Sequence, residues 1–404
     1  MRNPTICLNM IVKDEADIIV GTLKNLTEKI KFSYWVICDT GSSDNTRELI
    51  KDFFKSVDIS GELHDIPWKD FAYNRTEALK LARYKTDFAL IFDADDKIDG
   101  TIDLSNLEKG SGYHLQFGHG IRWKRLCLID NSLEWYYSGV MHEIIGCKDK
   151  KVERPLPGDY RVLTNVVVSA RNKKGQNKFL EDAKVLIKAH EKGDGLQYRY
   201  AFYAGECLRF SGKENWDESI KWYTQTANCD KTWGQERYWS CYQLGKMYDD
   251  KGEKEKAWYW WFKSYEYDNQ RQEAFFELIK KCRETNQFHQ AYTLYKMLKP
   301  MRKQDWEHKL FIVNHIYEHS LYSEMFIILH YVNKMNEGDE LLKKLFMANK
   351  PLPMYVNMTN FNLKFYINNI KKDNYEFCVK FLRYCNKFNV PDKLKTKILK
   401  IYDI

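Results

Sequence analysis

Short apolar runs alternate with amphipathic stretches over the first 130 residues of the chain. Strands are expected at residues 5–12, 34–38, 62–66, 88–92, 112–117 and 121–129. Helices are expected between the first four strands, at residues 17–29, 45–55 and 74–83. The run at 88–92 is apolar throughout, which is typical of a strand buried on both faces of a largely parallel sheet. The pattern therefore predicts an N-terminal α/β domain.

From residue 198 the pattern changes to pairs of helices. Residues 204–227, 242–265 and 278–297 each read as two helices with aromatic residues at i, i+3 and i+4. The equivalent positions Ile220, Ala257 and Ala291 are 37 and 34 residues apart, near the period of tetratricopeptide repeats. We interpret the aromatic stripe along these helices as interhelix packing rather than a sugar-binding platform. The stripe consists of Trp222, Tyr223, Trp258, Trp260, Trp261 and Tyr292.

Glycine and proline divide the chain. Eleven of the 20 glycines lie before residue 159, and no proline lies between Pro157 and Pro300. Frequent turn formers followed by long helix-permissive tracts indicate two kinds of domain. We expect an α/β domain at residues 1–172, an all-α region of helical repeats at 173–300, and a further helical region without an assignable period at 301–404.

Composition narrows the function classes. The net charge is +8, yet residues 1–100 carry 14 Lys and Arg against 18 Asp and Glu. The downstream lysines are interleaved with acids, so we expect no nucleic-acid partner. No apolar run reaches the roughly 18 residues of a membrane span, and no signal peptide is recognisable. The ten cysteines fit neither a zinc site nor a disulfide framework, and a cytoplasmic protein is expected.

Three carboxylates, Asp93, Asp95 and Asp96, directly follow the apolar run at 88–92. Carboxylates this close repel each other, so they stay ionised mainly where something positive compensates them, and their hard oxygens favour Mg²⁺ or Mn²⁺. The expected partner is a metal-bound diphosphate. The alternative is a solvated acidic turn, because isolated D-x-D tripeptides are common.

Two further residues have alternative interpretations. Asp39 ends a strand and precedes a Gly-Ser turn and a helix, where it can accept hydrogen bonds from a base or ribose or can merely cap the helix. Arg75 is expected in the first turn of its helix, where the helix dipole disfavours a cation. It therefore either reaches a phosphate or extends to solvent.

Four motifs, taken in order, resemble the family 2-like glycosyltransferases of the GT-A fold. They are Lys13-Asp14-Glu15-Ala16, the segment 39–46, Asn74-Arg75 and Asp93-Ala94-Asp95. The resemblance implies that the acid after the second strand contacts the nucleotide base, that the arginine lies near the phosphates, and that the second aspartate of the D-x-D holds the metal. By this resemblance, the nucleotide-sugar site contains Lys13, Glu15, Asp39, Asn74, Arg75, Asp93 and Ala94, and the metal site contains Asp95.

The segments 133–143, 169–171, 199–204 and 233–236 are similar to a subgroup of these transferases that carry tetratricopeptide-like repeats. Bacterial prophage-type enzymes that glycosylate peptide cysteines represent this subgroup. Related sequences often have a histidine near Val168 or Ser169 that can ligate metal. No histidine is present there in this chain, and His142 is the expected substitute.

The resemblance also implies inversion at the sugar, which requires a base for the acceptor on the opposite face. Glu143 is the candidate base, because it follows a glycine turn in a strand-rich segment near the same edge. Asp96 and Asp130 are alternatives. The non-functional interpretation of His142 and Glu143 is a polar pair on an edge strand.

Together these features predict a metal-dependent glycosyltransferase that uses a nucleotide-diphosphate donor, with a UDP-sugar favoured, and a protein, peptide or glycan acceptor. An alternative is a tetratricopeptide-type adaptor that binds a nucleotide-sugar without turnover. A third hypothesis is a nucleotidyltransferase, but residues 1–15 contain no glycine for the phosphate loop that such chemistry usually brings. The helical half is expected to recruit the acceptor or to form a homodimer, and not to touch the nucleotide.

Overall fold

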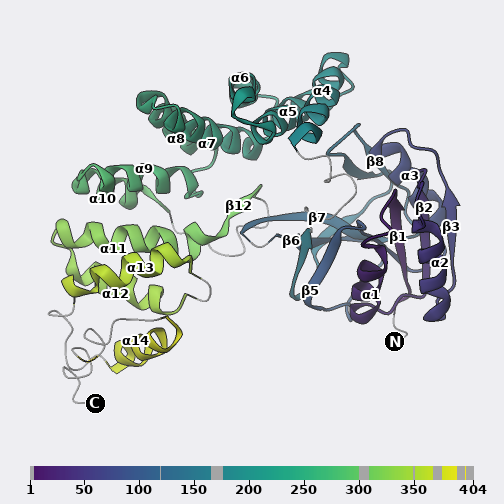
Figure 1. The fold of residues 1–404 in the computed structure, drawn as a ribbon, viewed down its shortest axis with the longest axis horizontal. Coiled ribbons are helices and arrows are strands. Elements are labelled where there is room, and N and C mark those ends of the chain that lie inside the picture. The colour runs from purple at the N-terminus through teal and green to yellow at the C-terminus, as the bar shows by residue number, and fades with distance from the viewer. Residues whose placement is uncertain are drawn as a thin grey trace. The chain divides into compact units, whose positions relative to one another are not determined.

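The computed structural model describes residues 4–118, 120–164, 176–299, 309–348, 351–366, 375–388 and 396. The chain divides into two compact units, Met1–Glu236 with Glu307–Phe311 and Arg237–Trp306 with Ile312–Ile404. Figure 1 labels many of their helices and strands. In the described ranges, no helix combines the length and the apolar character needed to cross a bilayer.

A large sheet organises the first unit (Figure 1). Its strands follow the order β3-β2-β1-β4-β7-β6-β11-β5, and β10 pairs with β6. The first four strands in this order are parallel, whereas β7 runs antiparallel to both β4 and β6. The strands are β1 (Ile6–Val12), β2 (Tyr34–Asp39), β3 (Gly61–Asp65), β4 (Phe88–Ile91), β5 (Asp96–Ile102), β6 (Ser111–Phe117), β7 (Ile121–Asp130), β10 (Val152–Pro155) and β11 (Gly158–Thr164).

Helices pack on both faces of the parallel strands because successive residues of β1 point to opposite sides. Leu8 belongs to an apolar cluster with Leu23 of α1 (Ile19–Lys29) and Ile50 of α2 (Thr46–Ser56). Cys7 instead packs with Ala78 of α3 (Phe71–Ala82). The strands are therefore buried on both sides, as the continuous apolar runs predict.

Three features of this unit differ from the sequence expectation or were not anticipated. Helix α3 begins at Phe71 rather than at residue 74, because the Asp70 side chain caps it by accepting a hydrogen bond from the Tyr73 amide (2.7 Å). Strands β5 and β11 form an antiparallel pair, and their half-exposed, polar sequences carry no apolar run. A separate hairpin joins β8 (Trp135–Ser138) to β9 (Ile144–Cys147).

The expected helix pairs are present. In the first unit α4 (Gln176–Lys192), α5 (Gln197–Ser211) and α6 (Trp216–Asn228) follow the sheet, and α7 (Gly234–Asp250) begins at the end of this unit. In the second unit α8 (Lys254–Tyr267), α9 (Glu273–Glu284) and α10 (Phe288–Met297) continue the series. The equivalent positions Ile220, Ala257 and Ala291 are all buried, as their spacing predicts. Three stripe residues, Tyr223, Trp260 and Trp261, are also buried, in agreement with a packing role.

The second unit also contains β12 (Ile312–Val313), α11 (Leu321–Tyr331), α12 (Met335–Phe346), α13 (Pro353–Asn362) and α14 (Tyr375–Lys387). Phe326, Leu342 and Tyr366 lie in one apolar cluster of this region. The residues at the expected domain boundary near 172, and the positions Val168, Ser169 and Arg171, lie outside the described ranges.

Candidate active site at the carboxyl edge of the sheet

The D-x-D motif forms a tight turn between β4 and β5. The amide of Asp96 donates to the carbonyl of Asp93 (3.2 Å), and the carbonyl of Ala94 accepts from the Thr22 hydroxyl of α1 (2.5 Å). Because β4 is parallel to β1, this turn lies at the edge where β1 and β2 also end. The fold thus places the acids where ligands of open α/β sheets gather.

Two arginines hold the first acid of the motif. Arg75 Nη2 donates to Asp93 Oδ1 (2.7 Å), and Arg125 Nη1 donates to Asp93 Oδ2 (2.9 Å). Burial acts to raise the pKa of Asp93, but the charges of Arg75 and Arg125 outweigh it and hold this pKa well below its ordinary value. Asp93 is therefore an ionised anchor between two guanidinium groups, which removes the interpretation of a purely solvated acidic turn.

Arg75 also contacts the candidate base. Its Nε donates to Glu143 Oε1 (2.7 Å), and the two side chains are only 7% and 10% exposed. Burial acts to lower the pKa of Arg75, but Asp93 and Glu143 outweigh it, so this pKa is raised. The expectation that Arg75 lies in the first helical turn is wrong, because α3 starts four residues earlier. Arg75 is paired in the interior, so of the two alternatives for its side chain, extension to solvent is wrong.

The third acid, Asp96, is buried at the start of β5. Burial, reinforced by the charge of Asp93, raises the pKa of Asp96 to about 8. A raised pKa favours the protonated form of this carboxyl, which lowers the repulsion within the turn. Asp95, between the two, is partly exposed.

Asp39 is fully buried at the end of β2. Its Oδ1 accepts from the amides of Gly41 and Ser42 (2.7 Å each), whereas Oδ2 is buried without a hydrogen-bond partner. These amides precede α2, and Asp44 instead accepts from the Thr46 amide at the start of that helix (3.0 Å). Asp39 is therefore not the cap of α2, and its Oδ2 remains a buried acceptor that a ligand or a water can satisfy.

The other residues predicted from the sequence to bind the nucleotide-sugar lie in two loops. In the loop after β1, Glu15 donates its amide to the Thr46 hydroxyl (2.8 Å), and Lys13 is exposed. Asn74 is fully buried and shapes the loop before α3, because its amide group donates to the carbonyls of Ile66 and Pro67 (3.3 and 3.2 Å). These contacts give Asn74 a loop-ordering role in this structure.

His142 and Glu143 end the loop 139–143 that joins β8 to β9. His142 has a positive φ of 52°, is exposed, and stacks on the ring of Tyr203 with centroids 3.8 Å apart and an interplanar angle of 8°. The ion pair with Arg75 brings Glu143 to the same edge as Asp93. Glu143 and His142 are thus loop residues and not an edge-strand pair.

Asp130, one of the alternative bases, lies at the wrong edge. It pairs in register with Phe88, the first residue of β4, whereas Asp93 follows the last one. Its carboxylate accepts from the Gly110 and Ser132 amides (2.6 and 2.9 Å) and orders local turns. Asp130 is therefore removed from the site.

Arg125 was not among the sequence-predicted site residues. It lies on β7, the antiparallel strand beside β4, and its side chain is 35% exposed. The basic character of the strand at 121–129 is the only sequence signal that points to it.

The residues at this edge are compatible with a divalent metal ion. The phosphates of a nucleotide-sugar would have to complete its coordination. In the part of the chain that the structure describes, no three His, Cys, Asp or Glu side chains converge closely enough to hold an ion by themselves. Mg²⁺ in nucleotide enzymes commonly takes one or two carboxylates together with substrate phosphates. Asp95 is a partly exposed carboxylate next to one already held by arginines, so its chemistry fits such a ligand.

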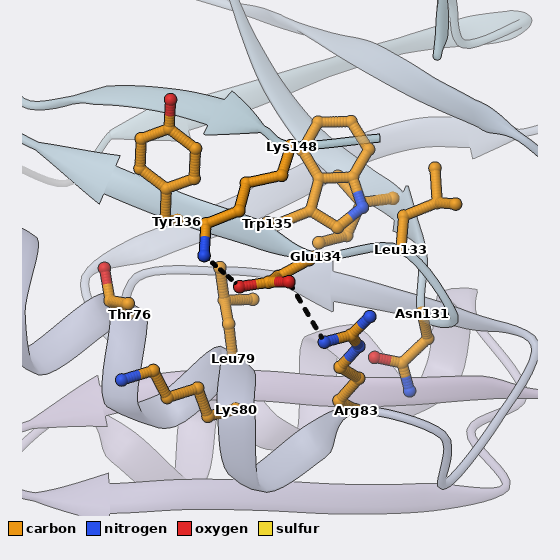
Figure 2. A pocket seen from close by; sticks show the side chains of 11 residues that line it. Thr76, Leu79, Lys80, Arg83, Asn131, Leu133, Glu134, Trp135, Tyr136 and Lys148 are labelled. Atoms are coloured by element: carbon orange, nitrogen blue, oxygen red, sulfur yellow. Dashed lines mark hydrogen bonds and ion pairs between the residues drawn. The ribbon is translucent and has the colours of Figure 1, made fainter. Parts of the chain in front are cut away.

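A cavity of about 420 Å³ lies away from these residues, between α3 and β8 (Figure 2). Figure 2 shows Glu134 between Lys148 and Arg83 on its wall. The cavity is also lined by Ile129 and Asn131, at the edge where β4 begins. The cavity is therefore not part of the candidate site at the carboxyl edge of the sheet.

Comparison with known proteins bears on the first unit. The family model of glycosyl transferase family 2 matches residues 7–107, which include Asp39, Arg75 and the D-x-D turn. This segment is therefore a glycosyltransferase domain, and the expected enzyme class and N-terminal α/β fold are confirmed. A search of curated proteins finds no match to the chain.

Several solved structures are distantly similar to the chain. S. aureus TarS residues 1–349 with UDP-GlcNAc is 9% identical, with 66% of this chain and 93% of that chain covered and a TM-score of 0.32. The mannosyltransferase PcManGT from Pyrobaculum calidifontis with GDP-Man and Mn²⁺ is 13% identical, with 65% and 86% covered and a TM-score of 0.31. A tetratricopeptide repeat protein from Parabacteroides merdae is 13% identical, with 59% and 98% covered and a TM-score of 0.28. Likenesses at these TM-scores carry no conclusion about function.

Proposed function

We propose that the protein is a metal-dependent, inverting glycosyltransferase that moves a sugar from a nucleotide-diphosphate donor, preferably a UDP-sugar, to a protein, peptide or glycan. The observation that carries the proposal is the joined set Arg125–Asp93–Arg75–Glu143 at the carboxyl edge of β4, beside Asp95. It combines cations for a leaving diphosphate, an acid for a metal and an acid for the acceptor within a glycosyltransferase domain.

Donor binding is assigned to the edge formed by β1, β2 and β4. The unpaired Oδ2 of Asp39 would accept an N–H of the base, which offsets the cost of leaving that oxygen buried and unsatisfied. Lys13, Glu15 and Ala94 would line the same donor site. Arg75, supported by Arg125, would face the diphosphate, since planar guanidinium groups suit phosphate oxygens.

Asp95 would hold the metal, with His142 as the second expected ligand. When bound, Mn²⁺ or Mg²⁺ would neutralise the charge that develops on the leaving diphosphate. Arg75 and Arg125, which both pair with Asp93, would also stabilise the negative charge of the leaving diphosphate. Both remain cationic at any working pH.

Glu143 would take the proton from the acceptor. Its Oε1 is held by Arg75, so Oε2 is the oxygen that would receive the proton. Asp96 is a weaker choice, because its carboxyl is buried, with only 2% of the residue exposed. The helical repeats would recruit the acceptor or join two copies of the chain.

The rival proposal is an adaptor that binds a nucleotide-sugar without turnover. The intact acids and the paired arginines weigh against it, because a binding module needs no acid at the acceptor side. A cytoplasmic location is part of the proposal. The nine cysteines whose side chains the structure describes are free thiols.

A donor panel tests the proposal. The full chain is incubated with UDP-, GDP- and dTDP-sugars and Mn²⁺, and the nucleotide released is measured by chromatography, with Asp95→Asn as the matched control. We expect release of nucleoside diphosphate from one donor by the wild type and not by the variant. Binding without release would establish the adaptor, and pyrophosphate formed from a nucleoside triphosphate and a sugar phosphate would establish a nucleotidyltransferase.

A further inference from the structure

The loop 139–143, which carries Glu143, is held by a helix of the repeat region. Arg199 Nε donates to the carbonyl of His142 (2.9 Å), and the amide of Val140 donates to the hydroxyl of Tyr200 (3.3 Å). The ring of Tyr203 stacks on that of His142. These three contacts come from one side of α5, and they bind both the backbone and a side chain of the loop.

The helix residues that make these contacts are themselves fixed. Arg199 pairs with Glu236 (2.9 Å) and donates to the Tyr203 hydroxyl (3.3 Å). Tyr200 is fully buried, and its hydroxyl donates to Asp194 (2.7 Å). The loop therefore contacts side chains of α5 that are themselves held by hydrogen bonds and an ion pair.

The loop needs such support because its backbone is unusual. Gly139 has a φ of 106°, and His142, immediately before Glu143, has a φ of 52°, a conformation that non-glycine residues adopt at an energetic cost. The contact of α5 with the His142 carbonyl and ring stabilises this conformation. The following residue, Glu143, accepts a hydrogen bond from Arg75 (2.7 Å).

We propose that Arg199, Tyr200 and Tyr203 of α5 are positioning residues that aim Glu143 at the acceptor, so that the first repeat helix completes the active site. This inference rests on the proposed glycosyl transfer. It differs from the expected role of the helical repeats, because the repeats then also position a catalytic residue and do more than recruit the acceptor or join two copies. It leaves nucleotide binding to the sheet, where Asp39 and Asp95 lie.

The test compares four variants of the full chain in two assays. Tyr203→Leu removes the stack, and Tyr203→Phe keeps it; Arg199→Met removes the carbonyl contact; Arg209→Met is the matched control. Arg209 lies on the same helix and is also paired with a glutamate, Glu206 (3.1 Å). Rates of donor turnover with Mn²⁺ and the affinity for UDP without metal are measured, because His142 is itself an expected metal ligand, and melting temperatures verify folding.

We expect Tyr203→Leu and Arg199→Met to lower the maximal rate by about 10- to 100-fold, since a displacement of about 1 Å at a catalytic group has effects of this size. UDP affinity should be unchanged, and Tyr203→Phe and Arg209→Met should keep the wild-type rate. If Arg199→Met does not fold, Arg199→Lys, which keeps the charge but not the planar donor, should show the rate loss with normal UDP affinity.

Two results would overturn the inference while leaving the proposed function intact. They are wild-type turnover in Tyr203→Leu or Arg199→Met, and a loss of UDP affinity equal to the loss of rate. A wild-type chain that turns over no donor would instead refute the proposed function, so the two failures are distinguishable.

Discussion

Replacing Asp93 by asparagine distinguishes the role of Asp93 from that of Asp95, the two acids of the D-x-D motif. Asp93 accepts one charge-assisted hydrogen bond from each of Arg75 and Arg125. The amide keeps one acceptor oxygen but turns an NH₂ group toward the other guanidinium, so one contact is lost and two donors oppose each other. Each such contact is worth about 1.5–3 kcal/mol, and removing one partner of a buried pair typically costs about 3–5 kcal/mol.

The structure places the loss for Asp93→Asn toward the lower end of that range. Arg75 keeps its second partner, Glu143, and Arg125 is 35% exposed and can regain water. We therefore expect a destabilisation of about 3 kcal/mol, measured by urea denaturation of the full chain. UDP binding in the presence of Mn²⁺ should persist, because the arginines no longer share their charge with a carboxylate.

Asp95→Asn should behave in the opposite way. It removes the charge that a divalent ion needs, so titration calorimetry should show metal-dependent UDP affinity reduced by about 2–4 kcal/mol with near-normal stability. If Asp93→Asn abolishes the effect of Mn²⁺ on binding while Asp95→Asn leaves it intact, the roles assigned to the two acids are reversed, and the anchor role of Asp93 is refuted.

Three further predictions concern other parts of the molecule. Asp39→Ala should weaken UDP binding even without metal; normal affinity with a lower melting temperature would show a purely structural role. Burial, partly offset by Arg199, raises the pKa of Glu236 to about 7 from 4.5, so the folded state holds this proton longer and stability falls as the pH rises between these values. Over this range the free energy of unfolding falls by about 3 kcal/mol, at about 1.36 kcal/mol per pH unit. Glu236→Gln should therefore make the melting temperature nearly independent of pH between pH 5 and about 7. A pH dependence equal to that of the wild type would contradict this role of Glu236. Glu273→Gln leaves the fully buried Arg271 without its counterion (2.8 Å) and should cost about 3–5 kcal/mol by denaturation, whereas the exposed Glu255→Gln should have little effect.

The parallel part of the sheet was predictable because its strands are apolar on both faces. β1, β2 and β4 lie within one or two residues of the expected ranges. Each is a run of mostly apolar residues that is buried on both faces of the sheet. Their carboxyl ends must meet at one edge, so the proximity of Asp39 to the D-x-D turn followed from the same pattern. The helix pairs were predictable from the spacing of Ile220, Ala257 and Ala291.

The rest depends on contacts that no local pattern encodes. β5 and β11 are polar, half-exposed strands stabilised by pairing with each other over about 60 residues of sequence. Arg125 reaches Asp93 because β7 inserts antiparallel beside β4. The hold of α5 on the loop 139–143 joins residues 57 and 60 apart in the sequence. Such pairings follow from tertiary packing, and single-sequence periodicity carries no record of them.

The most direct test of the central claim is the turnover of the identified donor by Glu143→Gln. The substituted side chain would keep its size and a hydrogen bond to Arg75 but would have no carboxylate to accept a proton. With water or the true acceptor as nucleophile, we predict a rate about 10²- to 10⁴-fold below that of the wild type, at unchanged affinity for UDP and Mn²⁺. A Glu143→Gln variant that releases the nucleotide at the wild-type rate would contradict the assignment of Glu143 as the base, and with it the proposed mechanism.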